Sequence, residues 1–286
     1  MSKLKVLPLL RKLKAEIKAE VGNFLKKPTL EVVVVGESPA SFLYVRNIQQ
    51  KAKQLGIDCK IASFPSSVTL KELKEKMQAL ADDSKVDGIM LQRPLPLGIN
   101  LDDLLKIIPA DKDVEGVVDE NLGKIISGVE APVPCTAKAV FDLIKEHNLL
   151  QFGKKVVIMG ISTLVGKPLL NWIAYHGGVQ VTMIDINTPN PWDYTRQADV
   201  LVVAIGCPRE VKADYLKPGA VVIDVGINQI TVDGYEQVVG DVDFADCESV
   251  ASAISVVPGG VGRVTTYCIF KNLLFLCNQR NINLRK

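Results

Sequence analysis

Residues 156–170, VVIMGISTLVGKPLL, are typical of a strand, a glycine-bounded turn and the start of a helix. Gly160 ends the apolar run and Gly166 lies at the start of the predicted helix. Glycines allow backbone amides at a helix N-terminus to approach a diphosphate, and Ser162 and Thr163 add hydroxyl donors. Because the turn lacks the full G-x-G-x-x-G pattern, an ordinary strand-to-helix turn is the competing interpretation.

Asp185 ends the next predicted strand, at roughly the 20-residue spacing of a ribose-binding carboxylate. Such a carboxylate accepts hydrogen bonds from the ribose diol and repels a 2′-phosphate. We therefore expect NAD rather than NADP, although a carboxylate that caps the strand end would have the same position.

Short β-branched runs alternate with helical stretches on both sides of this turn. Strands are predicted at 29–36, 59–65, 86–96, 154–160, 179–185, 199–206 and 220–227. Helices are predicted at 41–57, 69–81, 137–147, from the glycine turn through Trp172, and at 265–284 as an apolar-striped helix, whereas residues 101–136 are less regular. This alternation predicts an α/β fold with a doubly wound parallel sheet.

Composition excludes several classes of protein. The 286 residues include 34 Lys and Arg against 32 Asp and Glu, and this net charge of +2 gives no basic excess for nucleic acid. The six cysteines are scattered and form no CxxC pair, so we expect reduced thiols and no metal site. No apolar run is long enough to cross a bilayer, so we expect no membrane segment and a cytoplasmic protein.

Eight segments, in unbroken order, resemble the methylenetetrahydrofolate dehydrogenase/cyclohydrolase family. They are VGESPASFLYV, LQRPLP, DKDVEG, PCT, GISTLVGKP, KPGAVVIDVGIN, VVGDVDF and VVPGGVG, and they span nearly the whole chain. The resemblance implies a folate-binding domain, residues 1–136 with the helix 265–286, and a Rossmann-type dinucleotide domain, residues 137–264. It also implies a homodimer that acts in one-carbon metabolism, oxidising 5,10-methylenetetrahydrofolate with NAD(P) and hydrolysing the methenyl product.

The resemblance also assigns roles by matching position. Tyr44 would border the folate and Gln92 would lie beside the catalytic centre, while a loop would close over the site, formed by Pro258, Gly259, Gly260, Val261 and Gly262. Including the residues of the turn, the expected cofactor contacts are Gly160, Ile161, Ser162, Thr163, Gly166, Asp185, Gly206, Cys207, Ile227 and Thr266.

Several expected substrate-site residues depart from the family pattern. Ile48 occupies the lysine position of Tyr-x-x-x-Lys, and Glu115 stands where an aspartate anchors the pterin. Arg93 replaces an apolar residue and Arg263 replaces a proline. A further change, Ile161 for an arginine frequent in NADP-using members, agrees with the preference for NAD.

The missing lysine affects the two reactions differently. Hydride transfer needs aligned carbons and a nitrogen lone pair that the folate itself supplies. Hydrolysis of the methenyl cation needs a group that handles protons, which Ile48 is not. We therefore expect the dehydrogenase to persist and the cyclohydrolase to be weak or lost.

Alternatives to this interpretation remain open. Lys51 shares the face of Tyr44 but lies about 10 Å along the helix, against about 6 Å for the lost position. A bifunctional enzyme that uses Lys51 or Glu115 is one alternative. A paralogue that binds folate or dinucleotide without turnover is another, and an enzyme for a different reduced pterin is the third.

Overall fold

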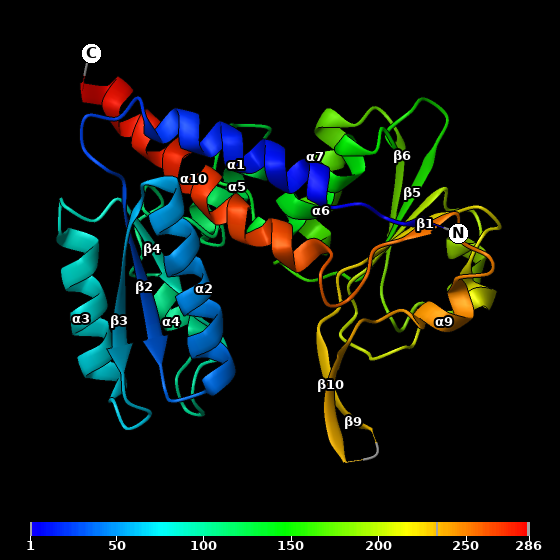
Figure 1. Cartoon of the computed structure of the whole chain (residues 1–286), viewed down its shortest axis with the longest axis horizontal. Helices are drawn as coiled ribbons and strands as arrows, with labels where there is room; N and C mark the ends of the chain where they lie inside the picture. Colours follow the sequence, from blue (N-terminus) through cyan, green and yellow to red (C-terminus); the bar gives the residue numbers. More distant parts are fainter. Residues whose placement is uncertain (1, 233, 285–286) are drawn as a thin grey trace. The chain divides into compact units, whose positions relative to one another are not determined.

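The computed structural model describes residues 2–232 and 234–284 (Figure 1). Contacts between Cα atoms divide the chain into two compact units, named here for their main sheets. The six-stranded unit comprises Met1–Arg11, Ile125–Val129 and Pro134–Cys268, and the three-stranded unit comprises Lys12–Lys124, Glu130–Val133 and Ile269–Lys286. Helices α1 (Leu7–Val21), α5 (Asp119–Ile126) and α10 (Val261–Leu284) contribute residues to both units.

The six-stranded unit is built on one parallel sheet. Its order is β1 (Ser2–Lys3), β11 (Ala253–Ile254), β8 (Val221–Asp224), β7 (Val200–Val203), β5 (Lys155–Met159) and β6 (Gln180–Ile184). The helices of this unit include α6 (Cys135–Glu146), α7 (Gly166–His176), α8 (Trp192–Thr195) and α9 (Phe244–Cys247). Every residue of β7 is buried, as expected for a parallel strand covered on both faces.

A two-stranded antiparallel hairpin extends from this unit (Figure 1). It consists of β9 (Asn228–Val232) and β10 (Tyr235–Val239), and Gly234 lies between them with a φ of +80°. The hairpin is not among the elements predicted from the sequence, because its short strands mix polar and apolar residues and lack a continuous apolar run.

The three-stranded unit has a second parallel sheet, in the order β3 (Asp58–Phe64), β2 (Thr29–Val35) and β4 (Gly88–Leu91). Its helices include α2 (Pro39–Leu55), α3 (Leu70–Asp82) and α4 (Leu101–Leu105). Helix α2 begins where the Ser38 hydroxyl accepts a hydrogen bond from the Ser41 amide. It ends at Gly56, whose φ of +85° allows a left-handed cap.

The predicted α/β architecture with parallel sheets is confirmed, and the predicted strands and helices are present with shifted ends. Residues 101–136 are more regular than expected, because α4 and α5 form there. Helix α10 was expected to carry an apolar stripe. Instead, consecutive residues on it are buried, including Cys268, Ile269 and Phe270, so more than one of its faces is covered.

The predicted boundaries of the folate-binding and dinucleotide-binding domains, at residues 136 and 264, stay predictions. The two compact units differ from these boundaries, because Met1–Arg11 and Ile125–Val129 group with the six-stranded sheet and the main segment of that unit is Pro134–Cys268. Over the described ranges, no helix is both long and apolar enough to span a bilayer. Within the same ranges, no group of His, Cys, Asp and Glu is arranged to hold a metal ion.

Candidate functional site

The glycine turn after β5 is closely packed. Gly160 has a φ of +133°, and a Cβ there would lie 2.2 Å from the Ala204 carbonyl oxygen. A Cβ on Gly166 would lie 1.8 Å from the carbonyl oxygen of Gly160. Both positions therefore require glycine, which is how a dinucleotide-binding turn brings a helix N-terminus close to a strand end.

Three predicted cofactor residues of this turn, Ile161, Ser162 and Thr163, are exposed. The Ser162 hydroxyl accepts a hydrogen bond from the Val165 amide at 3.1 Å, which fixes the turn just before α7. Its own proton can still be donated to a ligand. The exposed turn and the two glycines thus fit a diphosphate, and the individual contacts stay predictions.

The strand order places this turn at a switch point of the sheet. Strands β6 and β7 flank β5 on opposite sides, and ligands of doubly wound sheets bind outside the carboxyl ends of the strands at such a point. The turn after β7 contains Gly206, which is exposed and has a φ of +69°, and Cys207, which is half-buried. The contact between Gly160 and Ala204 shows that the two turns are neighbours.

Asp185 follows β6, the other neighbour of β5. Its Oδ1 accepts hydrogen bonds from the Asn187 amide at 3.1 Å and the Thr188 hydroxyl at 3.0 Å. The carboxylate therefore does cap the strand end. Its Oδ2, 3.5 Å from the Asn187 side-chain nitrogen, keeps acceptor capacity for a ribose, which stays a prediction.

Two more predicted cofactor residues, Ile227 and Thr266, differ in their exposure to solvent. Ile227 is exposed, and its Cδ1 would lie 3.7 Å from a Cβ placed on Gly262, so these two predicted site positions are neighbours. Thr266, in α10, is buried. Ile227 is therefore accessible to a ligand, whereas contact with Thr266 stays a prediction.

The predicted closing loop leads into the N-terminus of α10. Pro258 is exposed, Gly259 has a φ of +111°, and a Cβ on Gly260 would lie 2.5 Å from the Val256 carbonyl oxygen. Val261 is buried and begins the helix, while Arg263 is exposed. The loop is thus a glycine-dependent turn, and its closure over a substrate stays a prediction.

Helix α2 of the three-stranded unit carries the predicted folate residues. Tyr44 and Lys51 are half-buried. Ile48 is 0% exposed and is among the largest fully buried side chains of the described chain. The position at which the resemblance predicts the family lysine is therefore filled by a core side chain, which carries no group able to handle a proton.

Gln92 follows β4 and has an unusual environment. The side chain is 8% exposed, and its Nε2 donates to the Arg93 carbonyl oxygen at 2.5 Å. Its Oε1 is buried and has no hydrogen-bond partner among the described residues. Because an unsatisfied buried acceptor costs about 1–3 kcal/mol, this oxygen is a natural partner for a ligand donor.

Glu115 and Arg93 form an ion pair in the same unit. The Arg93 Nη2 lies 2.8 Å from Glu115 Oε1, and the Leu91 amide donates to Glu115 Oε2 at 3.2 Å. Burial raises the pKa of Glu115, while the Arg93 charge acts to lower it and the Asp113 carboxylate raises it further. Glu115 is thus held as an acceptor by two protein donors, and each oxygen keeps a lone pair for a ligand.

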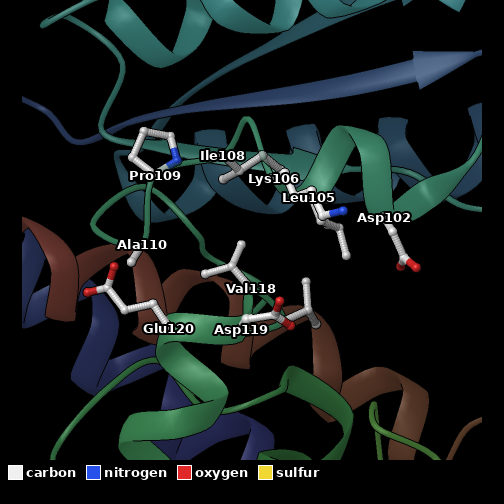
Figure 2. A pocket seen from close by; sticks show the side chains of 10 residues that line it. Asp102, Leu105, Lys106, Ile108, Pro109, Ala110, Val118, Asp119 and Glu120 are labelled. Carbon is white, nitrogen blue, oxygen red and sulfur yellow. The ribbon is translucent and has the colours of Figure 1, made fainter.

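A separate pocket of about 550 Å³ lies between α4 and the start of α5 (Figure 2). Apolar side chains and the acidic side chains of Asp102, Asp119 and Glu120 line it together. None of the residues predicted for substrate or cofactor lines this pocket, so we assign it no part in the site.

Two buried carboxylates, Asp224 and Asp241, were not predicted as site residues. Burial raises the pKa of Asp224 to about 7, although backbone amides, including that of Asp241, lower it. Each lies within an otherwise apolar segment of the sequence, Asp224 in VVIDVG and Asp241 in VVGDVD, and this pattern could have indicated a buried carboxylate. Carboxylates buried in such runs must bind donors.

The parallel sheet with a glycine turn at its switch point defines a Rossmann-type dinucleotide-binding domain, joined in one chain to a second α/β domain. Two family models match these regions. The tetrahydrofolate dehydrogenase/cyclohydrolase catalytic domain matches residues 4–115, and the NAD(P)-binding domain matches residues 134–281. The chain belongs to the tetrahydrofolate dehydrogenase/cyclohydrolase family, as its sequence motifs predicted.

Individual relatives agree with this placement. The bifunctional protein FolD of Ehrlichia ruminantium (strain Gardel) is 42% identical over 259 residues, covering 90% of this chain and 86% of that protein. That of Sulfurihydrogenibium sp. is 40% identical over 281 residues, covering 96% and 97%. The crystal structure of the Campylobacter jejuni enzyme FolD, a methylenetetrahydrofolate dehydrogenase/cyclohydrolase, has a TM-score of 0.90 at 34% identity, covering 98% of this chain and 99% of that one.

A Trypanosoma brucei methylenetetrahydrofolate dehydrogenase-cyclohydrolase, complexed with NADP cofactor and an inhibitor, is also similar. Its TM-score is 0.90 at 29% identity, with 97% of each chain covered. These comparisons establish the family and the NAD(P)-binding domain. The roles of individual residues stay predictions.

Proposed function

We propose that this chain oxidises 5,10-methylenetetrahydrofolate to 5,10-methenyltetrahydrofolate with NAD, and that its hydrolysis of the methenyl product is weak or absent. Membership of the family supports the oxidation. One structural observation supports the division between the two activities: Ile48 is fully buried where the family carries its lysine.

The proposed oxidation places few demands on the protein. Bound NAD would accept the hydride, and the folate nitrogen lone pair would stabilise the resulting cation. The task of the residues is then to bind and orient the folate. Gln92 offers a buried acceptor and Glu115 an anion, and both suit the donor-rich edge of a reduced pterin.

The proposed loss of hydrolysis follows from proton handling. Attack by water requires a positioned group that removes one proton and returns another. Arg93 stays protonated, and Glu115 is already engaged by Arg93 and by the Leu91 amide. Lys51 lies on the Tyr44 face of α2, so a bifunctional enzyme that uses Lys51 is the second candidate.

The preference for NAD is supported by two features of the cofactor region. Asp185 keeps an acceptor oxygen for a ribose diol, and a 2′-phosphate would be repelled there. Ile161 is exposed on the glycine turn and supplies no cation for such a phosphate.

We further propose a cytoplasmic homodimer. The β9–β10 hairpin supports self-association, because it exposes Tyr235 and Val238 at 75% and 43%. Sedimentation of the purified protein tests the dimer, and a hairpin variant with Tyr235→Ser and Val238→Ser should be predominantly monomeric.

Paired assays test the activity itself. Purified protein is supplied with methylenetetrahydrofolate and NAD to follow methenyl formation, and with methenyltetrahydrofolate alone to follow hydrolysis. Binding of NAD and folate without any methenyl formation would favour the non-catalytic paralogue instead.

A further inference from the structure

Asp241 is a buried carboxylate that ties two loops of the six-stranded unit together. It is 0% exposed. Its Oδ2 accepts hydrogen bonds from the amides of Ile205 at 2.7 Å and Gly206 at 2.9 Å. Its Oδ1 accepts one from the Asn228 side chain at 2.7 Å. One carboxylate thus holds the turn after β7 and the first residue of β9.

Asp224, at the end of β8, fixes the backbone of Asp241 in turn. Its Oδ1 accepts hydrogen bonds from the Asp241 and Gly226 amides, both at 3.0 Å, and its Oδ2 accepts one from the Val242 amide at 3.1 Å. Asp224 is therefore the support on which Asp241 is placed.

Both carboxylates pack directly against glycine backbone, where no side chain would fit. A Cβ on Gly226 would lie 2.3 Å from the Asp241 Cγ, and a Cβ on Gly240 would lie 1.7 Å from the Asp224 Oδ2. The hydrogen bonds from the Ile205 and Gly206 amides to Asp241 therefore fix the conformation of the turn.

We propose that Asp241 is a positioning residue for the dinucleotide, setting the shape of the Ile205–Cys207 turn and the base of the hairpin against which the cofactor binds. The proposal rests on the proposed function, since the cofactor contacts of Gly206, Cys207 and Ile227 belong to it. The amides of Ile205 and Gly206 donate to Asp241, so in this proposal the cofactor contacts the face of the turn that points away from Asp241.

The substitution Asp241→Asn isolates the effect of hydrogen-bond polarity. A side-chain amide has the shape of a carboxylate but carries one acceptor and one donor group. In either orientation, the introduced NH₂ group would face a donor, either the two turn amides or the NH₂ group of Asn228. Adding Asn228→Asp restores the match, because the new amide can then donate to the new carboxylate while its oxygen accepts from the turn.

The experiment measures NAD affinity by titration calorimetry for the wild type, Asp241→Asn and the double variant Asp241→Asn with Asn228→Asp. KM for folate, kcat and melting temperature are measured alongside. Asp241→Asn should weaken NAD binding by about ten-fold or more, while KM for folate changes less than about two-fold. The double variant should recover most of the lost affinity, as coupled partners do in a double-mutant cycle.

The matched control is Asp246→Asn. The Asp246 Oδ2 accepts a hydrogen bond from the Ala213 amide at 2.7 Å, but the residue is exposed and lies on α9, outside the two loops. This variant should bind NAD as the wild type does.

Unchanged NAD affinity in Asp241→Asn would overturn the proposal, and so would equal losses of NAD and folate affinity without recovery in the double variant. If Asp241→Asn does not fold, the double variant decides: it should fold and bind NAD, and failure to bind would be contrary to the proposal. A wild type that binds NAD without oxidising the folate would overturn the proposed function alone.

Discussion

The guanidinium of Arg93 lies 2.8 Å from the carboxylate of Glu115, and this contact joins two residues that the sequence predicts as departures from the family pattern. Arg93 follows strand β4, and Glu115 belongs to the loop that leads to α5. The arginine compensates for the burial of the acid, so Glu115 is an anchored acceptor rather than a free base. This arrangement suits pterin binding better than proton transfer.

Arg93→Met should destabilise the protein in a pH-dependent way. Burial already raises the pKa of Glu115 above its ordinary value of 4.5, and removing Arg93 raises it further. A raised pKa favours folding at low pH and loses that contribution as pH rises through the folded-state pKa. The free energy of unfolding should therefore match the wild type near pH 4 and fall below it by about 1–3 kcal/mol at pH 8. Denaturant melts over this pH range measure the difference, and a loss that is equal at both ends would contradict the assignment.

Ile48→Lys should restore some hydrolysis of the methenyl substrate at the expense of stability. Placing an amine in a fully buried apolar position should cost about 2–4 kcal/mol. Ile48→Met is the matched control, since it keeps the volume without the amine and should cost less than about 1.5 kcal/mol. Hydrolysis assays and melts on both variants check this. An equal gain of hydrolysis in Ile48→Met would show that the amine is not responsible.

Gly166→Ala should abolish cofactor binding while leaving folate binding intact. The added Cβ would lie 1.8 Å from the Gly160 carbonyl oxygen, so the turn must open. We expect a loss of about 2–4 kcal/mol in stability and at least about a ten-fold loss in NAD affinity. Gly123→Ala is the control, because nothing lies within 4 Å of its added Cβ and alanine favours the helix. Wild-type NAD affinity in Gly166→Ala would mean that the turn does not bind the diphosphate.

Asp185→Ser should shift the cofactor preference. Removing the charge takes away the repulsion of a 2′-phosphate and one acceptor for the ribose diol. KM for NAD should rise by about ten-fold while KM for NADP falls. Asp193→Ser, an exposed change on α8, should alter neither. Unchanged KM values in Asp185→Ser would leave the residue as a strand-end cap only.

The sequence predicts the framework well where packing alone decides it. Buried parallel strands such as β2 and β7 are rich in valine, and the sequence predicts both at their observed places. Gly160 and Gly166 were predicted from spacing, and the structure supplies the steric reason. The β9–β10 hairpin could not be found in the same way, since its two short strands contain no continuous apolar run.

The polar connections of the site were harder to foresee. Arg93 and Glu115 were recognised separately as substitutions, but their pairing depends on the approach of two loops that no local pattern encodes. The same is true of Asp241, whose donors at 205, 206 and 228 are far away along the chain. Burial of Ile48 differs in this respect, because Val45, Ala52 and Leu55 share its helix face at helical spacing.

The ratio of two rates in the unmodified protein tests the central claim most directly. Methenyl formation from methylenetetrahydrofolate and NAD is measured beside methenyl hydrolysis, with Lys51→Ala treated identically. Because Ile48 is buried and cannot handle a proton, we expect rapid oxidation and little hydrolysis above the uncatalysed rate. Lys51→Ala should then cause no further loss of hydrolysis. Hydrolysis as fast as oxidation, and abolished in Lys51→Ala, would contradict it.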